Sequence, residues 1–415
     1  MNILIVNQPL NNRGDESAHR ALVRSILKYI PEAKVRVLFG GNKQETINQF
    51  KVESDRTEYV RFYHKHMLKG DGFIRQGLQY PVLWRIHPYA LEYFNHFRWA
   101  DAVVCAPGGI CMGGFMNWNH ENQLLYAMKL HKPVFYYGRS IGPFWDEPEE
   151  KRLFKKQAIE ILNYASYVSL REAESMRIAH DLGIKNVVQT VDTAFLDYPE
   201  VEITKEISSK IGNSPYIVFV PNLLIWHYFY KGKAAKEEVI EFWAKAVDII
   251  KKHYPDHKTV MLPQTFNYHE YLGDDINLFK DIEKVRPNSD LIVTSDQNSS
   301  DIQQQIIRGA DAMFGSRYHS VVFAINNNVP FVAFSYEHKI AGLLEELGLQ
   351  GEMIDIKDLF TSAEFNQSVL DTFDAMIPTI HRAPEAQKAA KDKAMAAFEK
   401  FRDILESKFE STPKL

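Results

Sequence analysis

The sequence predicts an α/β protein built from two doubly wound, Rossmann-like domains that face each other across a cleft. Strand-like and helix-like segments alternate almost throughout the 415 residues, and this alternation is typical of parallel sheets covered by helices on both faces. The alternation restarts near Ser214, after a polar stretch with many turn residues, which indicates a domain boundary. The chain is also longer than one hydrophobic core usually supports.

The first domain is expected to comprise residues 1–205. "NILIV" predicts a buried first strand, and a helical pattern follows over residues 17–29. Further strands are predicted from "KVRVLFG", "ADAVVC", "KPVFYYG" and "SYVSL", with amphipathic helical segments between them. Residues 51–99 break this rhythm because they are dense in aromatic and basic side chains. They form either an inserted helical subdomain with an aromatic core or an aromatic-basic lip that contacts a sugar or a lipid headgroup.

The second domain is expected to comprise residues 206–380. Its strands are predicted from "SPYIVFV", "HKTVML", "DLIVTS", "DAMFG" and "VPFVAFSY", which helical patterns such as "DIQQQIIRGA" separate. Residues 381–415 form a charged helix that is expected to pack back across the two domains. Pro384 suits the first position of that helix, where a missing N–H costs no hydrogen bond.

The composition is that of a globular protein without a strong charge bias. Hydrophobic residues make up 45% and charged residues 25% of the chain, and the formal net charge is −4. This charge gives no general attraction to nucleic acid, so any anion site must be local. The chain has two cysteines, and it contains no apolar run typical of a signal peptide or a membrane span. We therefore expect a cytoplasmic protein that associates at most peripherally with the inner face of a membrane.

Two clusters of polar and cationic side chains follow strand-like segments of the second domain. They are Ser316, Arg317, Tyr318 and His319 after "DAMFG", and His338 and Lys339 after "VPFVAFSY". Ligands of doubly wound sheets bind outside the carboxyl ends of the strands. Ser316 is the expected N-cap of a helix whose first N–H groups can hold an anion, and Arg317 suits phosphate or carboxylate. If the two strands are neighbours, the clusters form one site for a small dianion or trianion. Alternatively, Arg317 pairs a structural carboxylate and His319 caps a helix.

The first domain offers candidates at its own strand ends. They are Asp15, Gly108, Gly109, Arg139, Ser140 and Arg171. The glycines allow a ligand to approach the backbone, but their spacing is not the dinucleotide-binding GxGxxG. Asp15 is either a helix cap or a contact to a base or a sugar hydroxyl, and each arginine alone is more often part of a structural ion pair. No set of residues has the spacing of a metal site, so we expect neither a metal nor a cofactor.

Several of these segments together resemble the polysaccharide pyruvyl transferase family. In family order they are "NRGDESAHRAL", "VVCAPGGICMGG", "RSIGPF", "VSLREAESMRIAHDLGIKNVVQTVDTAF", "MLPQTFNYHEYLGDD" and "GSRYHSVVFAINNNVPFVAFSYEHK". The resemblance implies a glycosyltransferase-B-like fold, phosphoenolpyruvate as the donor, and a pyruvate ketal in a cell-surface polysaccharide such as an exopolysaccharide. It implies that Arg317 and His319 are the donor-binding and catalytic residues. We also expect Asp15 to be catalytic and Gln264 to join the other candidates in binding substrate.

The resemblance also implies a reaction that suits these residues. Phosphoenolpyruvate carries a phosphate and a carboxylate, so two cationic sites are needed, with His319 as general acid and base. The second domain would hold the donor, and the first a sugar or lipid-linked oligosaccharide acceptor. The glycine loop reads Ala-Pro-Gly-Gly in place of an unbroken glycine run, and residues 51–99 match no family motif, which leaves the acceptor open. The alternatives are a nucleotide-sugar glycosyltransferase and a non-catalytic glycan-binding protein of the same fold.

Overall fold

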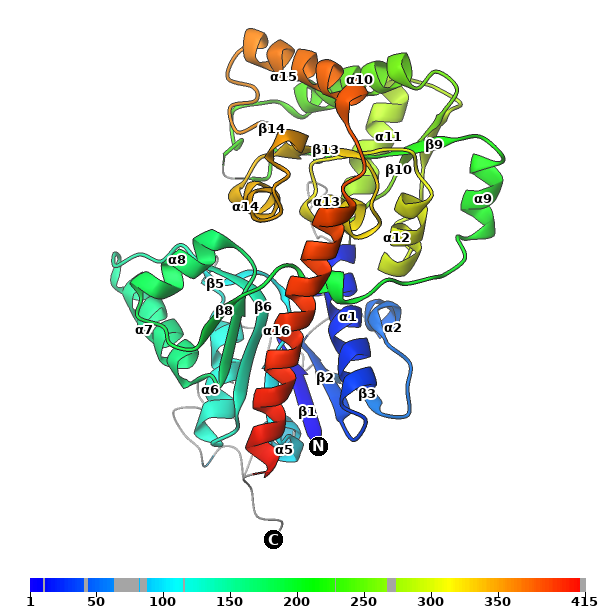
Figure 1. Cartoon of the computed structure of the whole chain (residues 1–415). Coiled ribbons are helices and arrows are strands. Elements are labelled where there is room, and N and C mark those ends of the chain that lie inside the picture. The colour runs from blue at the N-terminus through cyan, green and yellow to red at the C-terminus, as the bar shows by residue number, and fades with distance from the viewer. Residues whose placement is uncertain are drawn as a thin grey trace. The chain divides into compact units, whose positions relative to one another are not determined.

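The computed structural model describes all residues except 10, 11, 41–43, 63–81, 83–87, 115, 228, 267–273 and 411–415. The chain divides into two compact units. Unit 1 comprises Met1–Leu10, Ala18–Asp197 and Asp392–Leu415, and unit 2 comprises Asn11–Ser17 and Tyr198–Lys391. Each unit holds one sheet whose described strands all pair in parallel, with helices on its faces (Figure 1).

The sheet of unit 1 has the order β3-β2-β1-β4-β6-β7-β8, with β5 paired to β6. Its strands are β1 (Asn2–Val6), β2 (Lys34–Gly40), β3 (Thr57–Phe62), β4 (Ala102–Cys105), β5 (Gly108–Gly113), β6 (Val134–Gly142), β7 (Tyr167–Leu170) and β8 (Val187–Gln189). The strand order reverses between β1 and β4, and such a reversal is where doubly wound sheets open a crevice.

Two layers of helices cover the sheet of unit 1. They are α1 (Arg13–Tyr29), α2 (Gln44–Phe50), α5 (Pro88–Trp99), α6 (Trp118–Lys129), α7 (Glu149–Tyr164), α8 (Ala173–Asp181), a 3₁₀ turn (Thr193–Leu196) and α16 (Pro384–Glu410). One apolar cluster joins α5, α6, α7 and α8 to the strands through residues such as Val134 and Tyr136. Their neighbours Phe135 and Tyr137 point to the other face, where both rings pack against Phe401 of α16.

The sheet of unit 2 has the order β11-β10-β9-β12-β13-β14. Its strands are β9 (Tyr216–Val220), β10 (Lys258–Met261), β11 (Leu291–Val293), β12 (Met313–Gly315), β13 (Phe331–Ser335) and β14 (Met353–Asp355). The order reverses between β9 and β12, so the loops after these two strands emerge side by side at the carboxyl edge. β12 and β13 are parallel neighbours, as the interpretation of the two cationic clusters requires.

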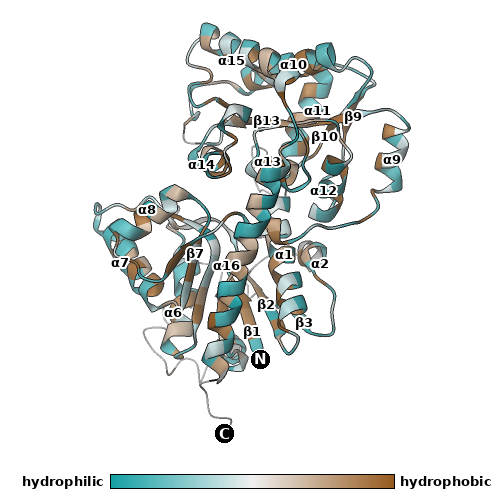
Figure 2. Ribbon diagram, viewed as in Figure 1, coloured by the Kyte–Doolittle hydropathy of each residue, from teal (hydrophilic) through white to brown (hydrophobic). Residues whose placement is uncertain are grey.

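Helices cover both faces of this second sheet. They are α9 (Lys205–Ile211), α10 (Lys236–His253), α11 (Asp275–Val285), α12 (Ser300–Arg308), α13 (Tyr318–Asn326), α14 (His338–Glu346) and α15 (Ala363–Met376), with 3₁₀ turns at Gln350–Glu352 and Ile377–Thr379. Figure 1 shows α10, α11 and α15 on one face and α12, α13 and α14 on the other. Apolar residues concentrate in the strands, whereas the helices carry both kinds of residue (Figure 2), as expected for buried parallel strands.

Three local predictions were wrong. Helix α1 begins at Arg13, four residues before the predicted start. The N-cap of α13 is Arg317 and not Ser316, whose backbone N–H instead donates to the Val220 carbonyl at 3.0 Å. Residues 57–62 form β3, which pairs with β2, so residues 51–99 are not solely a helical insertion. Most of the aromatic and basic residues that suggested a lip, among them residues 63–66, 80, 84 and 85, lie outside the described residues.

Candidate functional site

Arg317 lies in unit 2, directly after β12 and beside the reversal of the sheet. Its guanidinium is nearly buried and forms an ion pair with Asp275, with Nε 3.1 Å from Oδ1 and Nη2 closer still. Nη2 also donates to the Thr265 hydroxyl at 2.9 Å. Asp275 is therefore a carboxylate partner of the kind expected if Arg317 has a structural role.

Asp275 ties this arginine to the loop after β10. Its Oδ2 accepts hydrogen bonds from the backbone N–H groups of Gln264, at 2.9 Å, and Thr265, at 3.0 Å. The carboxylate therefore fixes both the guanidinium and two consecutive peptide groups. Gln264 is 2% exposed, and its side-chain nitrogen has no hydrogen-bond partner among the described residues. A buried amide donor of this kind is a candidate for contact with a ligand.

The ring of His319 packs against Gly14. A β-carbon built on Gly14 would lie 1.8 Å from Nδ1 and 1.9 Å from Cγ of His319, far inside any allowed contact. The ring of Tyr318, the preceding residue, lies edge to face with the His319 ring at a centroid distance of 5.0 Å. His319, which is half-buried, is therefore positioned by the absence of a side chain at residue 14.

The segment that carries Gly14 is bound into unit 2. The Arg13 N–H donates to the Gln264 carbonyl at 2.9 Å, and Asn12 forms a β-bridge with Thr265. Farther along the segment, the Ser300 N–H donates to Oε1 of the fully buried Glu16 at 3.1 Å. The first turn of α1 thus belongs to unit 2, whereas the rest of the helix belongs to unit 1.

Asp15 lies in this first turn, next to Gly14. It does not cap α1 in the way considered from the sequence. The Asn12 side-chain oxygen accepts the Asp15 N–H at 2.6 Å, and this bond is the one made by an N-cap residue. The Asp15 carboxylate accepts a hydrogen bond from the Asn12 amide and is 5% exposed.

The second cationic cluster also contains a carboxylate. Lys339 lies 3.1 Å from Oε1 of Glu337, and Oε2 of Glu337 lies 3.8 Å from Nε2 of His227. Burial alone would raise the pKa of the Glu337 carboxyl, but Lys339, followed by His227 and His338, outweighs burial and the pKa is lowered. Burial lowers the pKa of His227, against the opposing charge of Glu337. The cluster is therefore a charge-balanced group at the start of α14.

The loop after β9 connects the two clusters, although no motif in the sequence indicated it. The Trp226 ring centroid lies 5.9 Å from Cζ of Arg317, and the Trp226 and His227 rings meet edge to face at 5.4 Å. Through His227 the contacts continue to Glu337 and Lys339. The rule that ligands bind at the carboxyl ends of strands, applied to "YIVFV", would have found this loop, because β9 borders the reversal of the sheet.

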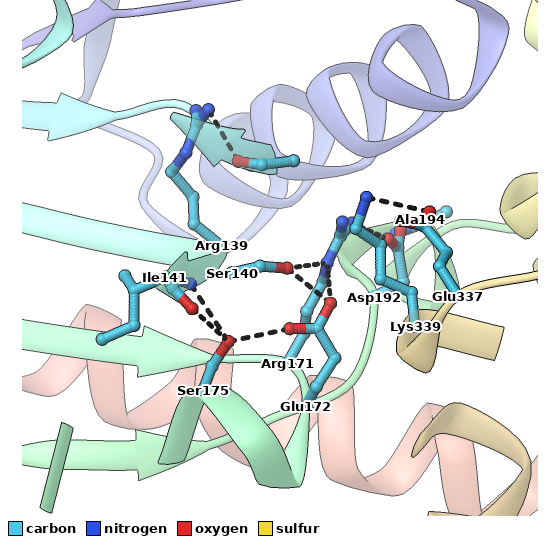
Figure 3. A network of polar contacts seen from close by, with 11 residues as sticks. Arg139, Ser140, Ile141, Arg171, Glu172, Ser175, Asp192, Ala194, Glu337 and Lys339 are labelled. Atoms are coloured by element: carbon cyan, nitrogen blue, oxygen red, sulfur yellow. Dashed lines mark hydrogen bonds and ion pairs between the residues drawn. The ribbon is translucent and has the colours of Figure 1, made fainter. Parts of the chain in front are cut away.

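Apart from Asp15, the candidates of the first domain lie in unit 1, where protein groups hold Arg139 and Arg171 (Figure 3). The guanidinium of Arg139 is fully buried and donates to the backbone carbonyls of Ala106, at 2.5 Å, and Gly109, at 3.1 Å. Arg171 lies 2.6 Å from Asp192, and its Nε is 3.1 Å from the Ser140 hydroxyl. These contacts fit structural roles, and a substrate-binding role for these residues stays a prediction.

The glycine loop of unit 1 retains open space. A β-carbon at Gly109 would meet nothing within 4 Å, and Gly108 has a φ of 153°.

Among the described residues, no three His, Cys, Asp or Glu side chains gather as a metal site. None of the described helices is both long and apolar enough to cross a membrane.

Glu121, in the first turn of α6, gives a prediction about stability. It is fully buried, and burial raises its pKa from 4.5 to about 9, with a small opposing effect of Gln157. The folded chain keeps this proton while the unfolded chain releases it, so stability is lost as the pH rises from 4.5 toward 9. We expect Glu121→Gln to raise the free energy of unfolding by about 3–4 kcal/mol at pH 8, and by less than about 1 kcal/mol at pH 5.

Urea unfolding at several pH values would measure this change. Glu150→Gln, which alters an exposed carboxyl in the first turn of α7, is the matched control and should have little effect. A gain that does not depend on pH would contradict the assignment of a neutral buried carboxyl.

Comparison with known proteins identifies the family. Residues 12–338 match the family model described as polysaccharide pyruvyl transferase. The chain belongs to this family. It is also 24% identical, over 442 residues, to the amylovoran biosynthesis protein AmsJ of Erwinia amylovora, with 98% of this chain and 100% of that protein covered. The predicted family is thereby confirmed, and with it a transferase of polysaccharide biosynthesis.

Solved structures confirm the glycosyltransferase-B-like fold. The UDP-GlcNAc 2-epimerase of Neisseria meningitidis is 14% identical with a TM-score of 0.57, covering 98% of this chain and 100% of that chain. A putative UDP-N-acetylglucosamine 2-epimerase of Listeria monocytogenes is 10% identical with the same TM-score, covering 100% and 98%. A UDP-glucose:anthocyanidin 3-O-glucosyltransferase is 11% identical with a TM-score of 0.52, covering 98% and 99%.

Proposed function

We propose that this protein transfers the pyruvyl group of phosphoenolpyruvate to two hydroxyls of a sugar, forming a pyruvate ketal in the biosynthesis of a cell-surface polysaccharide. Membership of the family and the likeness to AmsJ support the setting. The observation that carries the proposal is the arrangement in unit 2, where Arg317, His319 and Lys339 lie at the carboxyl ends of the neighbouring strands β12 and β13. Phosphoenolpyruvate would be bound there without a metal or cofactor.

The donor carries a phosphate and a carboxylate, and unit 2 offers matching groups. The N-termini of α13 and α14 carry partial positive charge, and Arg317 and Lys339 stand at those two ends. Because Asp275 and Glu337 already neutralise these cations, the donor would meet oriented hydrogen-bond donors rather than an excess of charge. Such preorganised donors stabilise charge that develops on a leaving group.

The reaction needs one proton at C3 of the donor. A protonated His319 would deliver it, which makes C2 electrophilic, and a sugar hydroxyl would add to C2. The C2–O bond to phosphate then breaks, and a second hydroxyl adds to C2 and closes the ketal. The two sugar hydroxyls each lose a proton. One of these protons returns to His319, which gave its own proton to C3, and the other leaves with the phosphate. General acid–base catalysis of this kind contributes about 10²–10⁴ in rate.

The main alternative is a nucleotide-sugar glycosyltransferase. It is favoured by the fold alone, because the Neisseria meningitidis epimerase binds UDP-GlcNAc and the anthocyanidin glucosyltransferase acts on UDP-glucose. A glycan-binding protein without activity would have no need of Arg317, His319 and Lys339 together. We propose that the reaction occurs in the cytoplasm, on a free sugar or a lipid-linked oligosaccharide.

Thermal unfolding with phosphoenolpyruvate, UDP, GDP or CMP tests the donor. A ligand at 100 times its dissociation constant stabilises the folded state by about 2.7 kcal/mol, so we expect a shift with phosphoenolpyruvate only. Removing Arg317 alone would leave the Asp275 charge buried and unpaired, which is strongly destabilising. The variant to use is therefore Arg317→Met combined with Asp275→Asn, and it should lose the shift.

A control arginine separates donor binding from general effects on stability. Arg286 lies at the end of α11 and pairs with Glu241 and Asp248 at the surface. Arg286→Met should keep the full shift with phosphoenolpyruvate. A shift with UDP alone would establish the glycosyltransferase alternative and exclude phosphoenolpyruvate as the donor.

A further inference from the structure

Trp226 is exposed although the groups that hold it are buried. Its side chain is 39% exposed, whereas Asn222 is fully buried and His227 is 6% exposed. Tryptophan is usually mostly buried, and leaving a large aromatic face in water is unfavourable. Buried groups therefore fix an indole of which part still meets solvent and is accessible to a ligand.

Hydrogen bonds and ring contacts fix the orientation of the indole. Nε1–H donates to the side-chain oxygen of Asn222 at 3.0 Å, and the same oxygen accepts the Leu224 N–H at 3.3 Å. The backbone carbonyl of Asn222 accepts the indole N–H of the buried Trp243 at 2.8 Å. His227 packs edge-on against the indole at an interplanar angle of 84°. The polar edge of Trp226 is thus occupied by the protein.

The loop that carries Trp226 adopts an uncommon backbone conformation. Leu224 has a φ of 63°, a value that costs a non-glycine residue about 1 kcal/mol or more. The same loop is anchored farther on, where the buried Tyr230 hydroxyl donates to the Ile356 carbonyl at 2.6 Å. Strain held in place by buried groups is a feature of ligand sites.

The position of the indole connects it with the proposed donor site. Cζ of Arg317 lies 5.9 Å from the ring centroid, and the loop follows β9 at the reversal of the sheet. We propose that Trp226 is the platform for the acceptor, on which a hexopyranose stacks the apolar C–H face of its ring. This inference rests on the proposed function and adds a contact from unit 2 to the acceptor.

The chemistry of a pyranose fits this surface. One face of the sugar ring carries C–H bonds, whose partial positive charge suits the negative face of an indole. The rim of the ring carries hydroxyls, which can reach the polar groups beside Trp226, such as Arg317. A lipid chain fits less well, because it would desolvate the charged groups next to the indole without giving them hydrogen bonds.

Saturation-transfer NMR of methyl β-galacto-, β-gluco- and β-mannopyranoside with the full chain tests the platform. We expect at least one of them to bind the wild type, with the strongest transfer to C–H protons on one face of the ring. Trp226→Ala should weaken this binding by about tenfold, and Trp226→Phe should weaken it less, because it keeps an aromatic face. Trp145, which is 38% exposed in unit 1, supplies the control, and Trp145→Ala should bind like the wild type.

The thermal shift with phosphoenolpyruvate, measured on the same variants, separates the platform from the donor site. We expect Trp226→Ala to keep this shift. The platform is overturned if no pyranoside binds the wild type, if Trp226→Ala binds the sugar unchanged, or if it loses the donor shift as well. If the wild type shows no donor shift while its sugar binding still depends on Trp226, the proposed donor fails and the platform stands.

Discussion

Replacement of His319 by alanine is expected to lower turnover by about 10²–10⁴-fold while phosphoenolpyruvate still binds. The reason is that the imidazole would supply the proton to C3 of the donor, whereas the helix termini and Arg317 would hold its charges. Turnover can be measured as phosphate release in the presence of a sugar acceptor, and donor binding as the thermal shift. Incorporation of solvent deuterium at C3 reports the proton transfer directly and should fall with turnover.

A second histidine of unit 2 provides the matched control. His257 pairs with Asp311 at 2.9 Å on the surface, and it lies after α10, in the loop that leads into β10. His257→Ala should leave turnover and the donor shift unchanged. Equal losses of turnover and donor binding in His319→Ala would instead make His319 a binding residue only.

The fold could be predicted because its signals are local. Strands such as β9 and β13 are continuous apolar runs, and helices such as α10 show helical periodicity; both patterns arise within a single element. The rule for strand ends then placed Arg317 and Lys339 at one edge of a sheet. The pairing of β12 with β13 confirmed that placement.

The partners of the site residues could not be predicted in the same way. Asp275 is 42 residues from Arg317, and no periodicity links two loops so far apart in the chain. The local signals were also misleading in places, since Asp15 suggested a cap that Asn12 provides. Contacts between loops depend on how whole elements pack, which a pattern within one element does not encode.

Arg139 and Arg171 illustrate the same limit in unit 1. Both follow strand-like segments of the sequence, so the strand-end rule singles them out as it does Arg317, although Arg139 lies within β6 in the structure. In the structure, Arg139 donates to backbone carbonyls, and Arg171 is held by the side chains of Ser140, Glu172 and Asp192. A rule that finds the edge of a sheet therefore does not show which protein groups already hold the arginines that it singles out.

The effect of Gly14→Ala should run against helix propensity. Within a helix, alanine is normally more stable than glycine by about 1 kcal/mol, but here the new β-carbon would lie 1.8 Å from Nδ1 of His319. The ring would have to move, and a displacement of about 1 Å can cost about 10²-fold in rate. We therefore expect Gly14→Ala to lower turnover by about that factor and to leave the thermal shift with phosphoenolpyruvate in place.

A double-mutant cycle distinguishes this positioning role from a general loss of structure. When His319 is already alanine, no ring stands in the way, so adding Gly14→Ala should cost little further activity and should no longer lower the melting temperature. Gly351→Ala is the matched control, because its β-carbon would meet nothing within 4 Å. Additive losses in the double variant would mean that Gly14 acts independently of His319. Strong coupling would mean that the first turn of α1, a segment distant in sequence, sets the position of the proton donor.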